Sequence, residues 1–146
     1  MNIKEMKLAH ILLVEDNEGD VLLTLEAFEE SNVKTEISVA KNGKEALDFL
    51  FKRGAFTDVK KPDLILLDIN IPIFSGHEVL RQIKTDPNLK KIPVIMLTTS
   101  SNQKDIDGAY ENHCNSYVNK PLAMNDFISA IQKIEQFWLQ LTTLSN

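Results

Sequence analysis

The stretch that decides the fold is PDLILLDINIP, from Pro62 to Pro72. Within it, Leu64 to Leu67 form an apolar run with no polar face, and a carboxylate, Asp68, follows directly. A strand that helices cover on both faces is expected to be continuously aliphatic, so this run predicts a central strand of a parallel sheet. An ionised group at the end of such a strand is costly unless it is paired, solvated in a cleft or bound to metal. Asp68 should therefore have partners elsewhere in the chain.

Composition limits the classes of protein to which the chain can belong. Its 146 residues, 43% hydrophobic and 25% charged, are typical of one globular domain, which we expect to span residues 1–146 with a core from about 9 to 141. The amino terminus MNIKEMKLAH carries charges where a signal peptide is apolar, and no apolar run reaches membrane-spanning length. We therefore expect a cytoplasmic protein with no membrane contact. A net charge of -5 without a basic block predicts no binding to nucleic acid.

Short aliphatic runs alternate with amphipathic stretches along the chain. The runs predict five strands, at residues 11–14, 36–40, 64–67, 94–97 and 116–119. Apolar residues at helical spacing between and after them predict five helices. The fifth helix is expected from about residue 125 to 141, and the first presents an apolar stripe made of Val21, Leu22, Leu25 and Phe28. Such an alternation predicts an α/β fold, an open parallel sheet with helices on both faces that binds ligands at the carboxyl ends of its strands.

Polar side chains follow the predicted strands at that edge of the sheet. Three carboxylates that converge repel one another or recruit a cation, and a set of oxygen ligands suits Mg²⁺. A lysine among them can act as counter-ion and as donor to a phosphoryl oxygen. An aspartate is ionised at neutral pH and can attack a phosphoryl donor, which forms an acyl phosphate. The residues at the strand ends are Glu15, Asp16, Asp68, Thr98, Thr99 and Lys120.

Four spaced motifs resemble one family. They are VEDN at 14–17, LLDINIP at 66–72, MLTTS at 96–100 and YVNKP at 117–121. In this order, over nearly the whole chain, they resemble the receiver domain of two-component response regulators. The resemblance implies a flavodoxin-like fold with five parallel strands in the order 2-1-3-4-5. The segment EDNEGDVLLTLEAFEE further resembles the single-domain regulators associated with bacterial phytochromes.

The resemblance implies a phosphoacceptor and a metal site. Asp68 is expected to accept a phosphoryl group from a sensor histidine kinase, for which the second resemblance points to a phytochrome. Glu15, Asp16, Asp68 and the backbone carbonyl of Asn70 are expected to hold Mg²⁺. Glu15 stands where an aspartate is more usual, but its longer side chain still supplies an oxygen.

The resemblance also implies how the phosphoryl group is contacted and sensed. Thr98 and Lys120 are expected to contact it, and Tyr117 is expected to be the rotameric switch residue. The peptide between Lys120 and Pro121 is cis in the family, which would aim the lysine. Thr99 is bulkier than the small residue often found there, so we expect it to restrict the attacking water and to lengthen the phosphoryl lifetime.

The implied function is that of a stand-alone phosphorylation-dependent switch, which is a regulator and not an enzyme beyond self-phosphorylation and autodephosphorylation. The chain ends at Asn146, soon after the fifth predicted helix, which leaves no room for a DNA-binding output domain. Output is therefore expected through a downstream protein partner or a phosphotransfer protein.

Other classes of protein remain as alternatives. Taken alone, Asp68 can be interpreted as a turn residue, and Lys120 as a solvated surface charge. A constitutive interaction module with the same fold would lack Asp68 or Lys120, and both are present. A phosphatase of the haloacid dehalogenase type needs an acid two residues after its nucleophile, where this chain has Asn70. A flavodoxin needs a phosphate-binding loop after its first strand, where EDNEGD offers acids.

The fifth helix predicts a homodimer. Its large apolar residues alternate steps of four and three, which places them on one seam as in a coiled coil. Burying them all against one small domain is difficult, so we expect pairing through the fifth strand and fifth helix. The seam residues are Phe127, Ile131, Ile134, Trp138 and Leu141, and Leu144 continues the apolar tail.

Overall fold

Five parallel strands form one sheet in the computed structural model, which describes residues 8–31, 33–121 and 123–141 and, at 140 and 141, the backbone alone. The strand order is β2-β1-β3-β4-β5, as the family resemblance implied. Because β3 is central, its aliphatic run is covered on both faces. The strands are β1 (Ala9–Val14), β2 (Thr35–Ala40), β3 (Leu64–Leu67), β4 (Val94–Thr98) and β5 (Ser116–Asn119).

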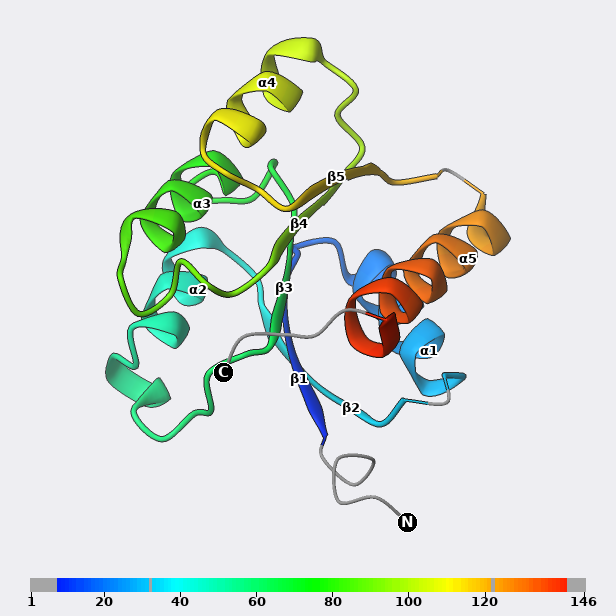
Figure 1. The fold of residues 1–146 in the computed structure, drawn as a ribbon, viewed down its shortest axis with the longest axis horizontal. Helices are drawn as coiled ribbons and strands as arrows, with labels where there is room; N and C mark the ends of the chain where they lie inside the picture. Colours follow the sequence, from blue (N-terminus) through cyan, green and yellow to red (C-terminus); the bar gives the residue numbers. More distant parts are fainter. Residues whose placement is uncertain (1–7, 32, 122, 142–146) are drawn as a thin grey trace.

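Helices cover both faces of this sheet (Figure 1). On one face lie α1 (Glu18–Glu29) and α5 (Met124–Glu135), which contact each other, and α5 continues as a π-helical segment over Gln136–Leu141. On the other face lie α2 (Gly43–Leu50), α3 (Gly76–Thr85) and α4 (Gln103–Glu111). A short 3-10 helix at Gly54–Phe56 occupies the connection before β3. Among the described helices, none combines the length and the apolarity that crossing a bilayer requires.

The central strand divides the core into two layers. Leu64 and Leu66 pack towards α1 and α5, whereas Ile65 and Leu67 pack towards α2 and α3, and all four side chains are completely buried. Successive side chains of a strand point to opposite faces, so each residue of the run fills a different layer. At about 1.5–3 kcal/mol for each fully buried aliphatic side chain, this strand stabilises the fold strongly and leaves only its end free for chemistry.

The apolar seam of the fifth helix is part of this core, which corrects the reason we gave for dimerisation. Phe127, Ile131 and Ile134 are buried against α1 and the sheet, and Trp138 packs partly against the same layer. Helical spacing identifies residues that share a face, but one domain covers this face without a partner. Leu144 and the side chain of Leu141 lie outside the described part of the chain.

The first helix also differs from its predicted stripe. Leu22 is 62% exposed, and the buried side chains of α1 are Thr24, Ala27 and Phe28. The buried face is rotated from the predicted one because small and polar residues, not only large apolar ones, face the sheet and α5.

Candidate functional site

Backbone hydrogen bonds bring three strand ends to one edge of the sheet. The Asp68 amide donates to the Val14 carbonyl at 3.1 Å, so the residue after β3 lies beside the end of β1. The Lys120 amide donates to the Thr98 carbonyl at 2.7 Å, which places the residue after β5 at the end of β4. The ladder therefore continues one residue beyond each strand and fixes where these side chains start.

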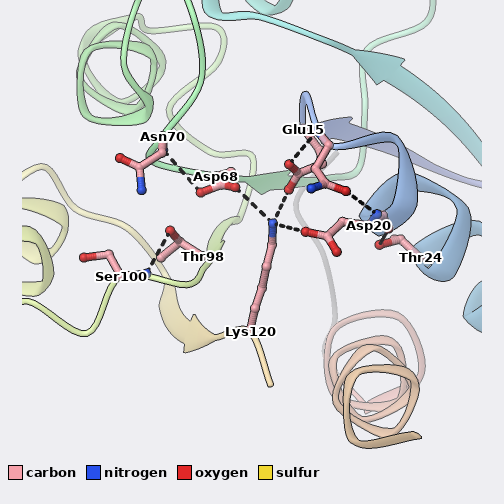
Figure 2. Close-up of polar contacts among 9 residues, drawn as sticks. Glu15, Asp20, Thr24, Asp68, Asn70, Thr98, Ser100 and Lys120 are labelled. Carbon is pink, nitrogen blue, oxygen red and sulfur yellow. Dashed lines mark hydrogen bonds and ion pairs between the residues drawn. The ribbon is translucent and has the colours of Figure 1, made fainter. Parts of the chain in front are cut away.

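Three carboxylates converge on the Lys120 ammonium (Figure 2). Its Nζ donates to Asp68 Oδ2 at 3.0 Å, to Asp20 Oδ2 at 2.9 Å and to Glu15 Oε2. The lysine side chain is only 4% exposed, as is that of Glu15. An ammonium has three N–H donors, so each carboxylate takes one. Lys120 is thus a buried counter-ion and not the solvated surface charge that its sequence position alone allows.

Sequence reasoning missed Asp20, which lies in α1. The available signal was its place in the first turn of α1, directly after the strand end that carries Glu15 and Asp16. Of Asp16 and Asp20, only Asp20 contacts the Lys120 ammonium, whereas Asp16, just after β1, is exposed.

Burial and ion pairing act in opposite directions on these charges. Burial raises the pKa of Glu15 to about 7, against the opposing effect of the hydrogen bond from Lys120. Burial alone would lower the pKa of Lys120, but its hydrogen bonds to Glu15 and Asp20 outweigh that effect, and the pKa is raised. The lysine therefore stays protonated at neutral pH and supplies a fixed positive charge beside Asp68.

The second oxygen of Asp68 is also held. The Asn70 amide donates to Asp68 Oδ1 at 3.2 Å, so both oxygens of the buried Asp68 carboxylate have a partner. The loop after β3 is clamped as well, because Gly43 at the start of α2 donates its amide to the Pro72 carbonyl at 3.0 Å. The loop thus presents Asp68 in one defined orientation.

The remaining predicted site residues lie around this centre. Thr98 is fully buried, and its hydroxyl accepts the Ser100 amide at 3.4 Å. The Tyr117 hydroxyl donates to the Ser100 carbonyl at 2.8 Å. The peptide between Lys120 and Pro121 is trans, in contrast to the cis peptide that the resemblance implied. Because trans is favoured by only about 0.5–1 kcal/mol before proline, the surroundings decide, and here the lysine reaches all three carboxylates from a trans peptide.

Ser100 connects this centre to α3 and α4. Its hydroxyl donates to Asp105 Oδ2 at 2.6 Å, and the other oxygen of Asp105 lies 3.1 Å from His77 Nε2. The hydrogen bond from Ser100 lowers the pKa of the Asp105 carboxyl most, and the contact with His77 lowers it further. Ser100 is therefore a second residue that sequence reasoning missed, and it joins the β4–α4 connection to Tyr117 on β5.

Two of the four predicted metal ligands are paired with the Lys120 ammonium. Glu15 and Asp68 both bind the Lys120 ammonium, whereas no three acidic, histidine or cysteine side chains of the described residues are grouped closely enough to hold a metal ion in this conformation. The oxygen-only donor set fits a hard divalent cation. A metal ion bound by Glu15 and Asp68 would compete with the lysine ammonium for their oxygens.

Comparison with known proteins identifies the family. A model of the response regulator receiver domain matches residues 11–132. The chain belongs to the response regulator receiver family. Members of this family act as phosphorylation-dependent switches in two-component signalling and bind a divalent metal, so the protein is a regulator and not a classical enzyme.

Similar receivers include phytochrome response regulators. Response regulator Rcp1 of Synechocystis sp. is 42% identical over 134 residues, which are 92% of this chain and 91% of Rcp1. The crystal structure of the phosphorylated cyanobacterial phytochrome response regulator RcpA matches with a TM-score of 0.94 and 41% identity, over 96% of this chain and all of that one. The Mn²⁺-bound form of Rcp1 matches with a TM-score of 0.91 and 41% identity, over 94% of this chain and 99% of that one. Phytochrome-associated response regulators pair with histidine kinases.

Proposed function

We propose that Asp68 is the phosphoacceptor of this receiver and takes its phosphoryl group from a sensor histidine kinase. The observation that carries the proposal is the buried Asp68 carboxylate held against the Lys120 ammonium at 3.0 Å. In the transfer, a carboxylate oxygen of Asp68 forms a bond to phosphorus while the bond from phosphorus to the kinase histidine breaks. Lys120 opposes the negative charge that gathers on the phosphoryl oxygens.

Mg²⁺ is the metal we propose for this site, bound by Glu15, Asp16, Asp68 and the backbone carbonyl of Asn70. When bound, the metal would neutralise the acidic cluster so that a phosphate dianion can approach. Glu15 and Asp68 already direct oxygens towards one cation, the Lys120 ammonium, and Asp16 follows Glu15 in the chain and is exposed.

Thr98, Lys120 and Tyr117 are the residues through which we propose that the phosphoryl group is bound and sensed. Thr98 lies at the end of β4, next to the end of β3, and its hydroxyl accepts the Ser100 amide, which leaves its own hydrogen to donate to a phosphoryl oxygen. Tyr117 is bound to the carbonyl of Ser100, so a shift of the β4–α4 connection would be transmitted to β5. The same centre would support self-phosphorylation from small donors and hydrolysis of the product. The restriction of the attacking water by Thr99 stays a prediction.

The proposed partners follow from the relatives. Similarity to Rcp1 and RcpA supports a phytochrome as the kinase, and we propose a cytoplasmic location. Output would pass to a downstream protein or a phosphotransfer protein, as expected of a single receiver domain, which we propose spans residues 1–146 with its core at about 9–141.

A homodimer through β5 and α5 remains part of the proposal, but it now rests on a surface groove that only the end of the seam helps to line. An apolar groove runs between the two elements and is lined by Val118, Ala130, Phe137 and Trp138, among others. Phe137 is 54% exposed at its edge. A second copy related by two-fold symmetry would cover the same patch on both subunits.

The direct test of the proposed function is phosphorylation by acetyl phosphate in the presence of Mg²⁺, followed by intact mass measurement. The wild-type protein should gain one phosphate, and Asp68→Asn should gain none. Asp58→Asn, which removes an exposed acid from the connection before β3, is the matched control and should be modified like the wild type. A phosphate gain by Asp68→Asn with unchanged lability in base would show that the nucleophile is another residue.

A further inference from the structure

Asp20 binds the ammonium of the proposed phosphoryl-contacting lysine from outside the proposed metal set. Its Oδ2 lies 2.9 Å from Lys120 Nζ, and its side chain is 28% exposed, against 9% for Asp68. Figure 2 shows that it approaches from α1, opposite to the β3 side from which Asp68 comes. The lysine is therefore bound from two directions by acids of different elements.

The backbone of Asp20 is fixed on both sides. Its amide donates to the Asn17 side chain at 2.9 Å, which is the cap of α1, and its carbonyl accepts the Thr24 hydroxyl at 2.7 Å. The Asn17 amide in turn donates to Glu15 Oε1 at 3.0 Å. The first turn of α1 thus ties Asp20 to Glu15, and the carboxylate is presented from a rigid base.

The three carboxylates that bind Lys120 differ in whether they are also proposed to bind the metal ion. Glu15 and Asp68 are proposed metal ligands, and a divalent cation bound to them would repel the ammonium from the same oxygens. Asp20 has no such competing role. It is the one of the three carboxylates that can keep its hydrogen bond to Lys120 after the other two are given up.

We propose that Asp20 is a positioning residue that keeps the Lys120 ammonium at the edge of the site while a metal occupies Glu15 and Asp68. The lysine then needs only a short movement to reach a phosphoryl oxygen. This role rests on the proposed function, in which Asp68 accepts the phosphoryl group and Lys120 contacts it. Its consequence is that Asp20 assists metal binding through Lys120 and not only through its own charge.

The test is a double-mutant cycle on the affinity for Mn²⁺, measured from the electron paramagnetic resonance signal of the free ion. Without the charge of Asp20, the only carboxylates left to pair with Lys120 are Glu15 and Asp68, and the metal ion needs both. Asp20→Asn should therefore weaken Mn²⁺ binding about fivefold. Glu18→Gln, which removes an acid with an 85% exposed side chain from the same turn, is the matched control and should change the affinity less than twofold.

In a Lys120→Met background, the effect of Asp20→Asn should shrink to the size of the control. An equal effect in both backgrounds would overturn the positioning role, because Asp20 would then act only as a nearby negative charge.

A second measurement does not depend on the folding of the Lys120→Met protein. In a ¹H–¹⁵N spectrum of the Mg²⁺-saturated wild type, the Lys120 ammonium should be protected from exchange and visible, and it should be lost in Asp20→Asn. A signal that persists in Asp20→Asn would contradict the proposal. Neither measurement involves phosphorylation, so failure of the phosphoacceptor assignment, seen with acetyl phosphate, is distinguishable from failure of this role.

Discussion

Lys120 carries a positive charge that the protein buries among three carboxylates. Its side chain is 4% exposed, and each of its N–H donors meets an acid. Removing one member of a buried charge cluster leaves the others uncompensated, which is far more costly than the loss of a surface ion pair. The lysine therefore contributes to folding as well as to the proposed chemistry.

Replacing Lys120 with Met should lower the free energy of unfolding by about 3 kcal/mol in metal-free buffer, because Glu15, Asp20 and Asp68 would repel one another. Mg²⁺ should restore part of this loss, since a cation can again neutralise the cluster. Urea denaturation with and without Mg²⁺ measures both effects. Lys44→Ala, which removes an exposed lysine that lies 2.7 Å from Asp48, should cost less than about 1 kcal/mol. A similar small cost for Lys120→Met would show that the cluster does not depend on the lysine.

Cys114 is a second buried ionisable group whose pKa is shifted by its surroundings. Burial raises the pKa of its thiol to about 11, so the thiolate fraction at pH 8 should be roughly 0.1%, against about a quarter for an unperturbed cysteine. Alkylation by iodoacetamide at pH 8 should therefore be at least about 100-fold slower in the native protein than in urea. Intact mass against time measures the two rates. Comparable rates would contradict both the burial of the thiol and its raised pKa.

At the scale of elements, the loop after β3 depends on a close contact between helix and strand. A Cβ atom on Gly76, the first residue of α3, would overlap the Asp68 carbonyl oxygen and lie 2.7 Å from Ile69 Cα. No side chain fits there without displacing the backbone of the proposed phosphoacceptor. The glycine thus allows α3 to start directly against the end of β3.

Gly76→Ala should lower the free energy of unfolding by about 2 kcal/mol or more, because the backbone must move to admit the methyl group. Gly54→Ala is the control, since Gly54 has a φ of 59° and nothing within 4 Å of the added atom. It should cost only the left-handed backbone penalty of about 1 kcal/mol. Urea denaturation of the two variants distinguishes them, and equal losses would rule out the close contact.

The elements differ in how well the sequence predicted them. Leu64–Leu67 was predicted to the residue, because a fully buried parallel strand is aliphatic without interruption and is bounded by polar residues. The seam of α5 was assigned to the wrong partner, because periodicity defines a face but not what covers it. Asp20 was missed because its contact with Lys120 spans 100 residues and depends on how α1 sits against the sheet.

At the scale of the whole molecule, the groove between β5 and α5 is the surface on which we place a second copy. Phe137→Glu puts a charge at its edge and should weaken the dimer more than about tenfold, as expected when an apolar contact of an interface becomes charged. Met124→Glu, at the other end of α5 and 59% exposed, is the control and should have little effect. Sedimentation over a range of concentrations, with and without beryllofluoride, measures the association.

Two outcomes of this experiment have different meanings. A wild-type protein that is monomeric in both forms at high micromolar concentration would contradict the dimer. A dimer whose dissociation constant is unchanged by beryllofluoride would contradict only the coupling of assembly to phosphorylation.

The central claim is that the chain switches through an acyl phosphate on Asp68. Sodium borohydride reduces such an acyl phosphate to homoserine, which peptide mass spectrometry locates in the sequence. After treatment with acetyl phosphate and Mg²⁺, the wild-type protein should yield homoserine at position 68 and at no other aspartate. Homoserine at Asp16 or Asp20, or at no position despite a gain of phosphate, would contradict the account.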